Sequence, residues 1–367
     1  MSRLLMFGYW GRRGALTQLT LELCHAIEDA GRHKTTTVSV STTNESIDEY
    51  WAFGDLIFPL GTFRRPASAF NPLAIGHFKE KLRRKVIADR TRSLVTLMPH
   101  VWTPAIGRLV RSLDIKHTIV VHDASPHPGD YTSLVNAWLL QGINRADQIV
   151  TLSEHVAQEL SDRHDVPRDK ITVLFHPDMV YGGQPATQQF DCKPLRLLFF
   201  GRLLAYKGLD LFLDALTILH QRDVPVETSV IGSGDLSSKK KRMQDLGVRV
   251  VNRWISADQV SGIFLEHDIV VLTHVTASQS GVVATAFGSG TPVVAVPVGG
   301  LVDQIDNDVT GLITEERSAE AIASAVQRIA NDRNILQRLR NNVVTQKRRR
   351  SMTEFLDSLS EVALRDV

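Results

Sequence analysis

Short apolar runs alternate with helical patterns along the first half of the chain. The apolar runs favour buried strands, which we predict at 4–8, 36–40, 94–98, 117–121 and 148–152. Between them, apolar residues recur every three or four positions, which predicts helices at 15–30, 104–113, 131–143 and 154–162. This alternation is typical of β/α units that build a mostly parallel sheet.

A second series of the same kind starts at residue 195. Its predicted strands are 195–200, 227–231, 248–252, 268–273 and 292–296. Its predicted helices are 208–220, 236–245, 257–264 and 280–288. Phe355, Leu359 and Val362 recur at helical spacing near the end of the chain and predict a last amphipathic helix. We therefore expect an α/β protein with two Rossmann-like domains.

A segment rich in Pro, Gly and Gln, without periodicity, separates the two series. It divides the chain into an N-terminal domain at 1–180, a linker at 181–194, a C-terminal domain at 195–345 and a helical segment at 346–367 that packs back toward the N-terminal domain.

In doubly wound sheets, ligands bind at the carboxyl ends of the strands. The loops after Phe200, Ile231, Thr273 and Val296 are therefore predicted to line a cleft between the two domains.

Charge and composition narrow the class of protein. The 42 Lys and Arg nearly balance the 40 Asp and Glu, so we expect no binding to nucleic acid. Two cysteines in 367 residues exclude a disulfide framework. The apolar run at the N-terminus is too short for a secretory signal, which predicts a cytoplasmic protein. The uncharged segment 269–302 contains several glycines and prolines, which favours a soluble sheet over a membrane span.

Glycines follow the first predicted strand in the sequence GYWGRRG at 8–14. A helix is predicted to start next, so backbone amides near Gly11 and Gly14 are candidates for binding an anionic part of a donor substrate. The spacing is not GxGxxG, and no acidic residue ends the second strand, so an NAD site is not indicated. A tight turn explains the same glycines equally well.

The strongest pattern opens the second domain, where LLFFGRLLAYKG at 197–208 ends a strand and starts a helix. Gly201 turns the chain, and Arg202 and Lys207 place two cations in one strand-end loop. Arginine binds phosphate oxygens through a planar fork and lysine through a point charge. The pair is therefore predicted to bind a nucleoside diphosphate as it leaves a sugar.

This loop, and the stretch GSGTPVVAVPVGGLVDQIDNDVTGLI at 288–313, resemble the retaining glycosyltransferases of family 4, which have the GT-B fold. RADQIVTLSEHV at 145–156 and ITVLFHPD at 171–178 are similar to elements that close the first domain in that family. Asp303 stands where the family has a glutamate. His122 resembles the family's histidine that faces the donor sugar, and Gly300 lies in the family's donor-binding stretch.

The chain departs from the family at a pair of glutamates, which would fall on Ala277 and Thr285. Some branches of the family look similar in having a QSG element instead, here Gln279, Ser280 and Gly281. The amides at Ser280 and Gly281 are candidates for donating to phosphate or sugar, and Thr285 for binding a ribose hydroxyl. The alternative is an N-cap serine and an inward-facing threonine.

A metal site has no support in the sequence. Asp306, Asn307 and Asp308 form a DxD, but they lie at a predicted surface turn, and the thirteen histidines show no metal-ligand spacing. No cofactor is predicted, because the donor is itself the substrate. His100 and Trp102 follow a predicted strand and are candidates for the acceptor pocket, with a packed loop as the alternative.

Basic residues outnumber acidic ones by nine to two between 56 and 92. Phe78, Leu82 and Val86 recur between those charges as on an amphipathic helix, so residues 78–92 are a candidate contact with an anionic membrane surface. The alternative is a solvated helix face.

The resemblance implies a metal-independent retaining hexosyltransferase with a UDP-, GDP- or ADP-sugar donor. The implied acceptor is a glycan or a lipid-linked sugar, in polysaccharide, exopolysaccharide or lipopolysaccharide biosynthesis. We expect the protein in the cytoplasm, with peripheral contact to the membrane. The alternatives are a nucleotide-sugar epimerase of the same fold and a non-catalytic subunit that binds sugar nucleotides.

Overall fold

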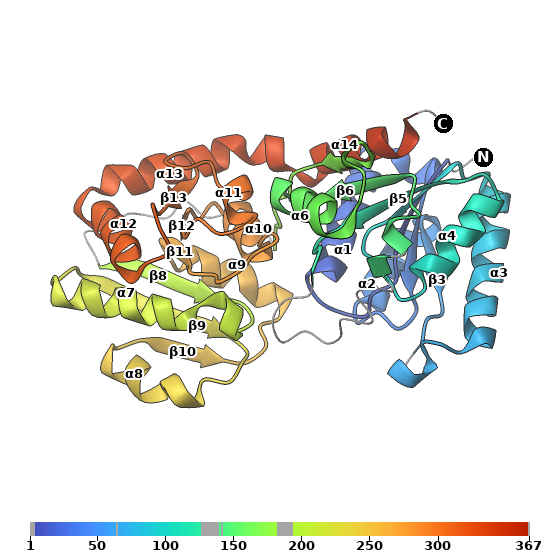
Figure 1. Cartoon of the computed structure of the whole chain (residues 1–367). Helices are drawn as coiled ribbons and strands as arrows, with labels where there is room; N and C mark the ends of the chain where they lie inside the picture. The colour runs from blue at the N-terminus through green and yellow to red at the C-terminus, as the bar shows by residue number, and fades with distance from the viewer. Residues whose placement is uncertain (1–3, 64, 126–138, 141, 182–193, 366–367) are drawn as a thin grey trace. The chain divides into compact units, whose positions relative to one another are not determined.

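The computed structural model describes residues 4–63, 65–125, 139–140, 142–181 and 194–365 (Figure 1). The chain separates into two compact units, Met1–Phe175 with Met352–Val367, and His176–Ser351. Most of the predicted helix at 131–143 and of the predicted linker at 181–194 lies outside the described residues. No helix in the described ranges is long and apolar enough to cross a membrane.

The first unit is built on a parallel sheet with the strand order β3-β2-β1-β4-β5-β6-β7. Its strands are β1 (Leu5–Tyr9), β2 (Thr36–Ser41), β3 (Ile57–Leu60), β4 (Ser93–Thr96), β5 (Lys116–Val121), β6 (Gln148–Thr151) and β7 (Ile171–Val173). Its helices include α1 (Ala15–Asp29), α2 (Ile47–Tyr50), α3 (Pro72–Asp89), α4 (Thr103–Ser112), α6 (Glu154–His164) and α14 (Met352–Leu364). The last helix, α14, packs against α1.

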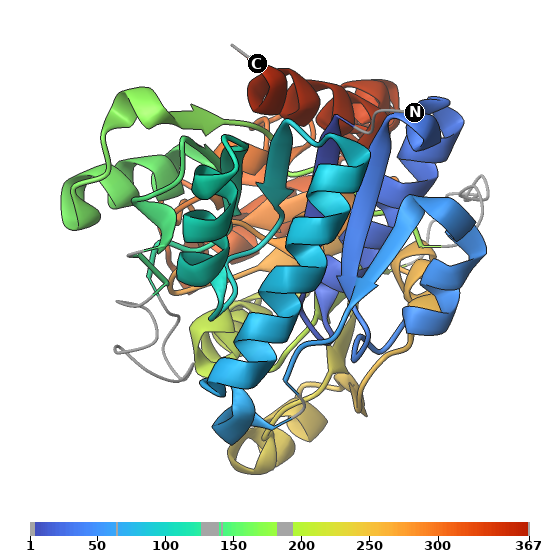
Figure 2. The same ribbon diagram turned by 90° about the vertical axis from the view of Figure 1, so that its right-hand side faces the viewer.

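Helix α3 lies across the sheet of the first unit (Figure 2), and its apolar stripe is buried. Asn71 caps its first turn by accepting hydrogen bonds from two backbone amides. Phe78, Leu82 and Val86 are buried, and the Phe78 ring packs edge-on against Trp10 and Trp102. Within the predicted membrane contact at 78–92, Phe78 and Leu82 therefore cannot touch a membrane, because the core of the first unit already covers them.

The second unit has its own parallel sheet with the order β10-β9-β8-β11-β12-β13. The strands are β8 (Leu195–Phe200), β9 (Val226–Gly232), β10 (Arg249–Asn252), β11 (Ile269–Leu272), β12 (Val293–Ala295) and β13 (Gly311–Ile313). The helices are α7 (Leu209–Gln221), α8 (Lys240–Asp245), α9 (Ala257–Leu265), α10 (Gly281–Gly288), α11 (Leu301–Gln304), α12 (Ala319–Asn331) and α13 (Arg333–Gln346). Successive residues of β8 enter two separate apolar clusters, as expected for a sheet covered on both faces.

The strands of both predicted series are confirmed, with ends that differ from the expected ones by at most two residues. Strands β3, β7 and β13 are not among the predicted strands. Helix α12 was also not predicted, although Ile322, Val326 and Ile329 already carry the apolar spacing that it buries.

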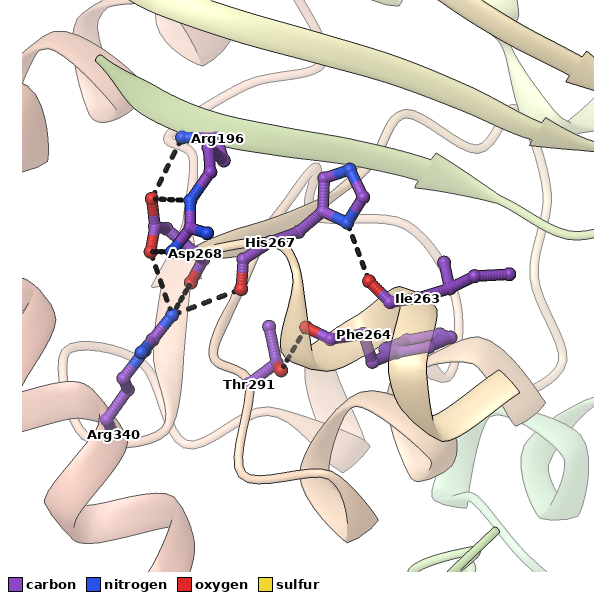
Figure 3. A network of polar contacts seen from close by, with 7 residues as sticks. All are labelled: Arg196, Ile263, Phe264, His267, Asp268, Thr291 and Arg340. Carbon is purple, nitrogen blue, oxygen red and sulfur yellow. Dashed lines mark hydrogen bonds and ion pairs between the residues drawn. The ribbon is translucent and has the colours of Figure 1, made fainter. Parts of the chain in front are cut away.

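One buried carboxylate links three elements of the second unit at the start of its central strands (Figure 3). Asp268, just before β11, accepts hydrogen bonds from the backbone amide of Arg196 at 2.9 Å and from its guanidinium at 2.9 and 3.2 Å. Arg340 of α13 donates to the same carboxylate at 3.1 Å. Burial by itself raises the pKa of Asp268, but the bonds and charges of the two arginines lower it below the usual value.

We expect Asp268→Asn to lower the free energy of unfolding by about 3–5 kcal/mol, because it leaves two arginines without their buried counter-charge. Chemical denaturation monitored by circular dichroism measures the loss. Since the pKa of Asp268 is lowered in the folded protein, its contribution is present at neutral pH and is lost as the pH falls through that pKa.

Asp308 provides a matched control. It also receives two arginines, Arg328 at 3.2 Å and Arg338 at 2.9 Å, but it is exposed. We expect Asp308→Asn to cost less than about 1 kcal/mol. Equal losses for the two variants would contradict the role of burial.

Candidate active site

The loop after β8 is held against the loop after β9. The amide of Gly201 donates to the carbonyl of Ile231 at 3.0 Å, and the amide of Leu203 donates to that of Ser233 at 2.9 Å. Gly201 and Gly232 both have positive φ, and a Cβ on Gly232 would lie 1.7 Å from the Gly201 carbonyl oxygen. Only glycine can lie this close to the Gly201 carbonyl. The backbone on both sides of Arg202 is therefore held against the end of β9.

The other end of the same loop is fixed to the end of β11. The Thr273 hydroxyl donates to the carbonyls of Lys207 at 3.0 Å and Gly208 at 2.8 Å. Val275 donates its amide to the carbonyl of Tyr206 at 2.7 Å. Gly208 has φ +73, and a Cβ there would lie 2.0 Å from the Thr273 carbonyl oxygen. Segment 201–208 is therefore anchored to two neighbouring strands.

This anchored segment carries both cations that the sequence predicted. Lys207 is buried, and its Nζ lies 2.7 Å from Nε2 of His274. The same ammonium lies 5.3 Å from the centre of the Tyr206 ring, a cation–π distance. Arg202 is exposed, and one of its guanidinium nitrogens donates to the Tyr206 hydroxyl at 3.3 Å. Tyr206 thus contacts both cations.

The QSG element begins α10 beside this segment. A Cβ on Gly201 would lie 3.4 Å from the Val282 side chain in the first turn of α10. Gln304 contacts the Ser280 backbone at two points, accepting from its amide at 2.6 Å and donating to its carbonyl at 3.4 Å. The residues predicted from two separate motifs therefore lie next to each other.

The Ser280 side chain does not cap the helix. Its hydroxyl is buried and has no hydrogen-bond partner among the residues that the structure describes, and the same holds for Oε1 of Gln279. The amide of Ser280 is engaged by Gln304, so the polar group of Ser280 that lacks a partner within the described residues is its hydroxyl. A buried polar atom without a partner is costly, and it is typical of a site completed by a ligand or water.

Two further predicted residues have their hydrogens engaged within the protein. The Thr285 hydroxyl donates to the Gly281 carbonyl at 2.7 Å, as the inward-facing alternative predicts. The Gly300 amide donates to the Ala277 carbonyl at 2.8 Å. In this arrangement Thr285 offers a ligand only its acceptor lone pairs.

The DxD segment forms the predicted surface turn. The Asn307 side chain accepts from the Ile313 amide at 2.8 Å, and the Asp308 carboxylate binds Arg328 and Arg338. Within the described ranges, no group of three His, Cys, Asp or Glu side chains is arranged to bind a metal ion.

The glycine loop of the first unit differs from the prediction. The Gly14 amide, at the start of α1, donates to the Glu45 carboxylate at 2.9 Å. A protein carboxylate therefore already takes the place predicted for an anionic ligand, which corrects the assignment of Gly14. A Cβ on Gly11 would lie 2.5 Å from the Tyr9 hydroxyl, so this glycine is explained by the turn.

Trp102 is a core residue and not an acceptor contact. It is 2% exposed, and its indole nitrogen donates to the Ala69 carbonyl. The packed-loop alternative is correct for this residue. His100 accepts from the Trp102 amide through Nδ1 at 3.2 Å, and burial lowers the pKa of His100 to about 4, so its ring is neutral at neutral pH.

His122 lies directly after β5. Its Nε2 is 2.9 Å from the Leu97 carbonyl oxygen, which can only accept, so the ring carries its proton on Nε2. Burial lowers the pKa of His122, and the bond to Leu97 and the charge of Asp123 oppose that shift in part. A neutral ring held in this way presents Nδ1 as a hydrogen-bond acceptor.

A pocket of about 440 Å³ lies beside α8 and β10. Its lining includes Gly234, Lys240, Met243, Gln244, Val250 and Asn252. It contains none of the predicted site residues, and it lacks the paired cations of segment 201–208. The chemistry therefore places the candidate site at segment 201–208 and the start of α10.

Sequence reasoning missed three residues of this site. Tyr206 lies inside the motif at 197–208, in which only Gly201, Arg202 and Lys207 are predicted site residues. His274 directly follows Thr273, which was recognised as a strand end. Gln304 is 24 residues from Ser280, and no local pattern indicates their contact.

Two family models match the chain, Glycosyltransferase Family 4 over residues 16–177 and Glycosyl transferases group 1 over residues 194–332. Its two Rossmann-like parallel sheets give the chain the GT-B fold that glycosyltransferases share. It belongs to the family 4 type of these enzymes, in a form without the pair of glutamates.

Relatives by sequence are glycosyltransferases. An uncharacterized glycosyltransferase of Methanocaldococcus jannaschii is 26% identical over 53% of this chain and 54% of the relative. A D-inositol 3-phosphate glycosyltransferase of Corynebacterium aurimucosum is 29% identical over 52% and 50%. The amylovoran biosynthesis glycosyltransferase AmsK of Erwinia amylovora is 29% identical over 38% and 36%. The chain spans about half the length of the first two relatives.

Solved structures share the fold over the whole chain. A glycosyltransferase of Rickettsia africae superposes with a TM-score of 0.72 at 15% identity and covers 100% of both chains. HepE of Anabaena, in complex with UDP and glucose, superposes with a TM-score of 0.70 at 15% identity and covers 98% of both chains.

Gly208→Ala tests the anchoring of segment 201–208. We expect it to lower stability by several kcal/mol and to weaken nucleotide binding, because the added Cβ collides with the Thr273 carbonyl. Thermal denaturation and calorimetric titration measure the two effects.

Gly247→Ala is the matched control. Gly247 has a similar φ of +65, but a Cβ there meets nothing within 4 Å, so we expect a cost of about 1 kcal/mol and unchanged nucleotide binding. Equal effects of the two substitutions would show that backbone strain alone, and not the approach to Thr273, matters.

Proposed function

We propose that this protein transfers a sugar from a nucleoside diphosphate sugar to a glycan or lipid-linked acceptor, with retention at the anomeric carbon and without a divalent metal. The observation that carries the proposal is the segment 201–208, which presents Arg202 and Lys207 next to the first turn of α10. A diphosphate needs several preorganised donors and positive charges close together.

Each group has a defined part in binding the diphosphate. Lys207 and Arg202 neutralise charge that grows on the leaving nucleoside diphosphate as the bond to the sugar breaks. The Ser280 hydroxyl and the first amides of α10 donate to phosphate oxygens, and the helix dipole favours the negative charge. The free hydroxyl of Ser280 gains in this way the partner that it lacks in the described protein.

The chemical step needs no protein nucleophile. The acceptor hydroxyl attacks the anomeric carbon on the face from which the diphosphate departs, and a phosphate oxygen of the leaving group takes its proton. The C–O bond to the phosphate breaks and the new glycosidic bond forms on the same face. Positioning and electrostatic stabilisation then supply most of the rate enhancement.

Two histidines of the first unit have proposed contacts with substrate. His122 holds its ring with Nε2–H on Leu97, so Nδ1 is available to accept a hydrogen bond from a sugar hydroxyl. His100 is neutral at neutral pH, because burial lowers its pKa to about 4, and it is a candidate contact for the acceptor.

The proposed setting is polysaccharide, exopolysaccharide or lipopolysaccharide synthesis in the cytoplasm. AmsK, one relative by sequence, is named for amylovoran biosynthesis, and HepE was solved with UDP and glucose. The two cations bind a diphosphate, which UDP-, GDP- and ADP-sugars share. The similarity to HepE favours a UDP-sugar among them.

We expect Arg202→Ala and Lys207→Ala each to reduce transfer by roughly two or more orders of magnitude, because losing one preorganised contact to the leaving group costs roughly 3 kcal/mol. Product formation from a panel of UDP-, GDP- and ADP-sugars measures the effect. Arg249→Ala, which removes an exposed cation paired with Glu266, is the control and should transfer at the wild-type rate. Near-normal turnover of either site variant at saturating donor would contradict the phosphate assignment.

Product analysis in the same assay separates the alternatives. A transferase releases nucleoside diphosphate and joins the sugar to the acceptor. An epimerase returns the nucleotide sugar with one inverted carbon and needs no acceptor. A non-catalytic subunit binds the nucleotide sugar and leaves it unchanged.

We expect EDTA to leave transfer intact. The Asp308 carboxylate is already bound by two arginines, and the lysine and arginine of segment 201–208 supply the positive charge that a metal provides in other transferases. Activity assayed with excess EDTA, and then with added Mg²⁺ or Mn²⁺, tests this. Activity lost with EDTA and restored by metal would contradict metal independence.

The proposed peripheral contact with a membrane involves the start of α3 and its exposed basic residues, not its buried apolar stripe. Phe70 and Leu73, at the start of this helix, are 66% and 83% exposed, and Lys81, Arg83 and Arg84 follow on exposed positions. Glu80 pairs with both arginines and offsets part of their charge. Exposed apolar residues beside basic ones favour an anionic lipid surface.

We expect the protein to float with vesicles that contain anionic lipid, and to bind less as salt rises, because each Lys or Arg near such a surface contributes about 1 kcal/mol. Leu73→Ser should reduce recovery in flotation, whereas Val344→Ser, at an exposed apolar position of the second unit, should not. Equal recovery with neutral and anionic vesicles would contradict the electrostatic contact, and no recovery with either would mean that α3 is a solvated face.

A further inference from the structure

Lys207 contacts His274, a residue that has no role in the proposed chemistry so far. Lys207 ends the loop after β8, and His274 follows β11 by two residues, so each stands at the carboxyl end of one of two paired strands. The two side chains are 9% and 3% exposed, and their nitrogens lie 2.7 Å apart. A buried contact this short requires one donor and one acceptor.

The chemistry of the two groups decides which is which. An aliphatic amine is a much stronger base than imidazole, so the proton belongs to Lys207. The ammonium therefore donates to Nε2 of a neutral His274, whose own proton is on Nδ1. A hydrogen bond to a neutral acceptor takes away none of the positive charge of the ammonium.

A lysine that binds the leaving diphosphate through its charge is best held by a neutral acceptor. A carboxylate in place of His274 would also fix the ammonium, but it would cancel the charge that the leaving diphosphate needs. Without this acceptor, the flexible side chain of Lys207 would be less ordered before substrate binds, at a cost to affinity.

His274 itself is well placed to act as a fixed support. Its backbone carbonyl accepts from Nε of Arg317 at 2.9 Å, and the residues on both sides of it are bound to the loop that carries Lys207. The ring of Tyr206 lies near both side chains, with its centre 6.3 Å from that of His274.

We propose that His274 is a positioning residue, which orients the ammonium of Lys207 for the diphosphate and leaves its charge intact. This inference rests on the proposed function of the site. A hydrogen bond to a charged group corresponds to a change of about ten- to a hundredfold in an equilibrium or rate constant. Removing it should appear mainly in the affinity for nucleoside diphosphate and in kcat/KM for the donor.

Three substitutions at this position separate the possible roles. His274→Leu removes the acceptor, and we expect kcat/KM and the affinity for nucleoside diphosphate to fall about ten- to a hundredfold. His274→Gln keeps a neutral acceptor, and both quantities should stay within a few-fold of the wild type. His274→Glu keeps an acceptor but cancels the charge, so its loss should resemble that of His274→Leu.

His267→Leu is the control for loss of a buried histidine. His267 lies just before the same strand, at its opposite end, and its Nδ1 donates to the Ile263 carbonyl at 2.6 Å. We expect this variant to be less stable but to bind nucleoside diphosphate as the wild type does. The ligand for calorimetry is whichever of UDP, GDP and ADP gives the wild type the largest thermal shift.

The outcomes distinguish this inference from the proposed function. If the wild type transfers sugar and His274→Leu keeps its kcat/KM, or if His274→Gln loses as much as His274→Leu, the positioning role is wrong while the transferase assignment stands. If the wild type neither binds nucleotide nor transfers sugar, the proposed function fails.

A direct measurement on the wild type does not depend on activity or on the folding of variants. In histidine labelled with nitrogen-15, the signal of His274, assigned by its absence in His274→Gln, should show a proton on Nδ1 and a bare Nε2. A proton on Nε2 would overturn the proposal.

Discussion

The approach of Gly208 to the main-chain carbonyl of Thr273 is the contact on which the candidate site depends. It brings the loop after β8 against the end of β11, and the Thr273 hydroxyl then satisfies two carbonyls of that loop. At the other end, a Cβ on Gly232 would lie even closer to the Gly201 carbonyl oxygen, at 1.7 Å against 2.0 Å for Gly208 and Thr273. Two cations that would otherwise sit on a flexible loop are thus held by backbone contacts to neighbouring strands, which lowers the entropy lost when an anion binds.

The resemblance to family 4 implies a pair of glutamates that this chain does not carry. At the two family positions stand Ala277, which is buried, and Thr285, whose hydroxyl bonds to its own helix. Two neutral polar groups contact these cations: the Tyr206 hydroxyl binds Arg202, and the imidazole of His274 binds Lys207. Neutral partners take away none of the positive charge, which suits an anionic ligand.

Features of the fold and the site can be predicted from the sequence where they depend on local signals, such as a glycine in a turn or apolar residues at regular spacing. The glycines of the motif at 197–208, the strand ends and the two cations could be predicted, because strand, turn and helix signals are local. The contacts of Gln304 with Ser280 and of Glu45 with Gly14 join residues 24 and 31 positions apart, and only the folded chain reveals them. The apolar stripe of α3 was recognised correctly as amphipathic, but periodicity cannot tell whether a core or a membrane covers such a stripe.

Calorimetric titration of the wild type with a nucleoside, its monophosphate and its diphosphate, for uridine, guanosine and adenosine, tests the central claim most directly. If the anchored cations bind the diphosphate, the second phosphate should add at least tenfold in affinity for the preferred base, and this gain should disappear in Lys207→Ala. Equal affinity for the monophosphate and the diphosphate, or a gain that persists without Lys207, would contradict the account.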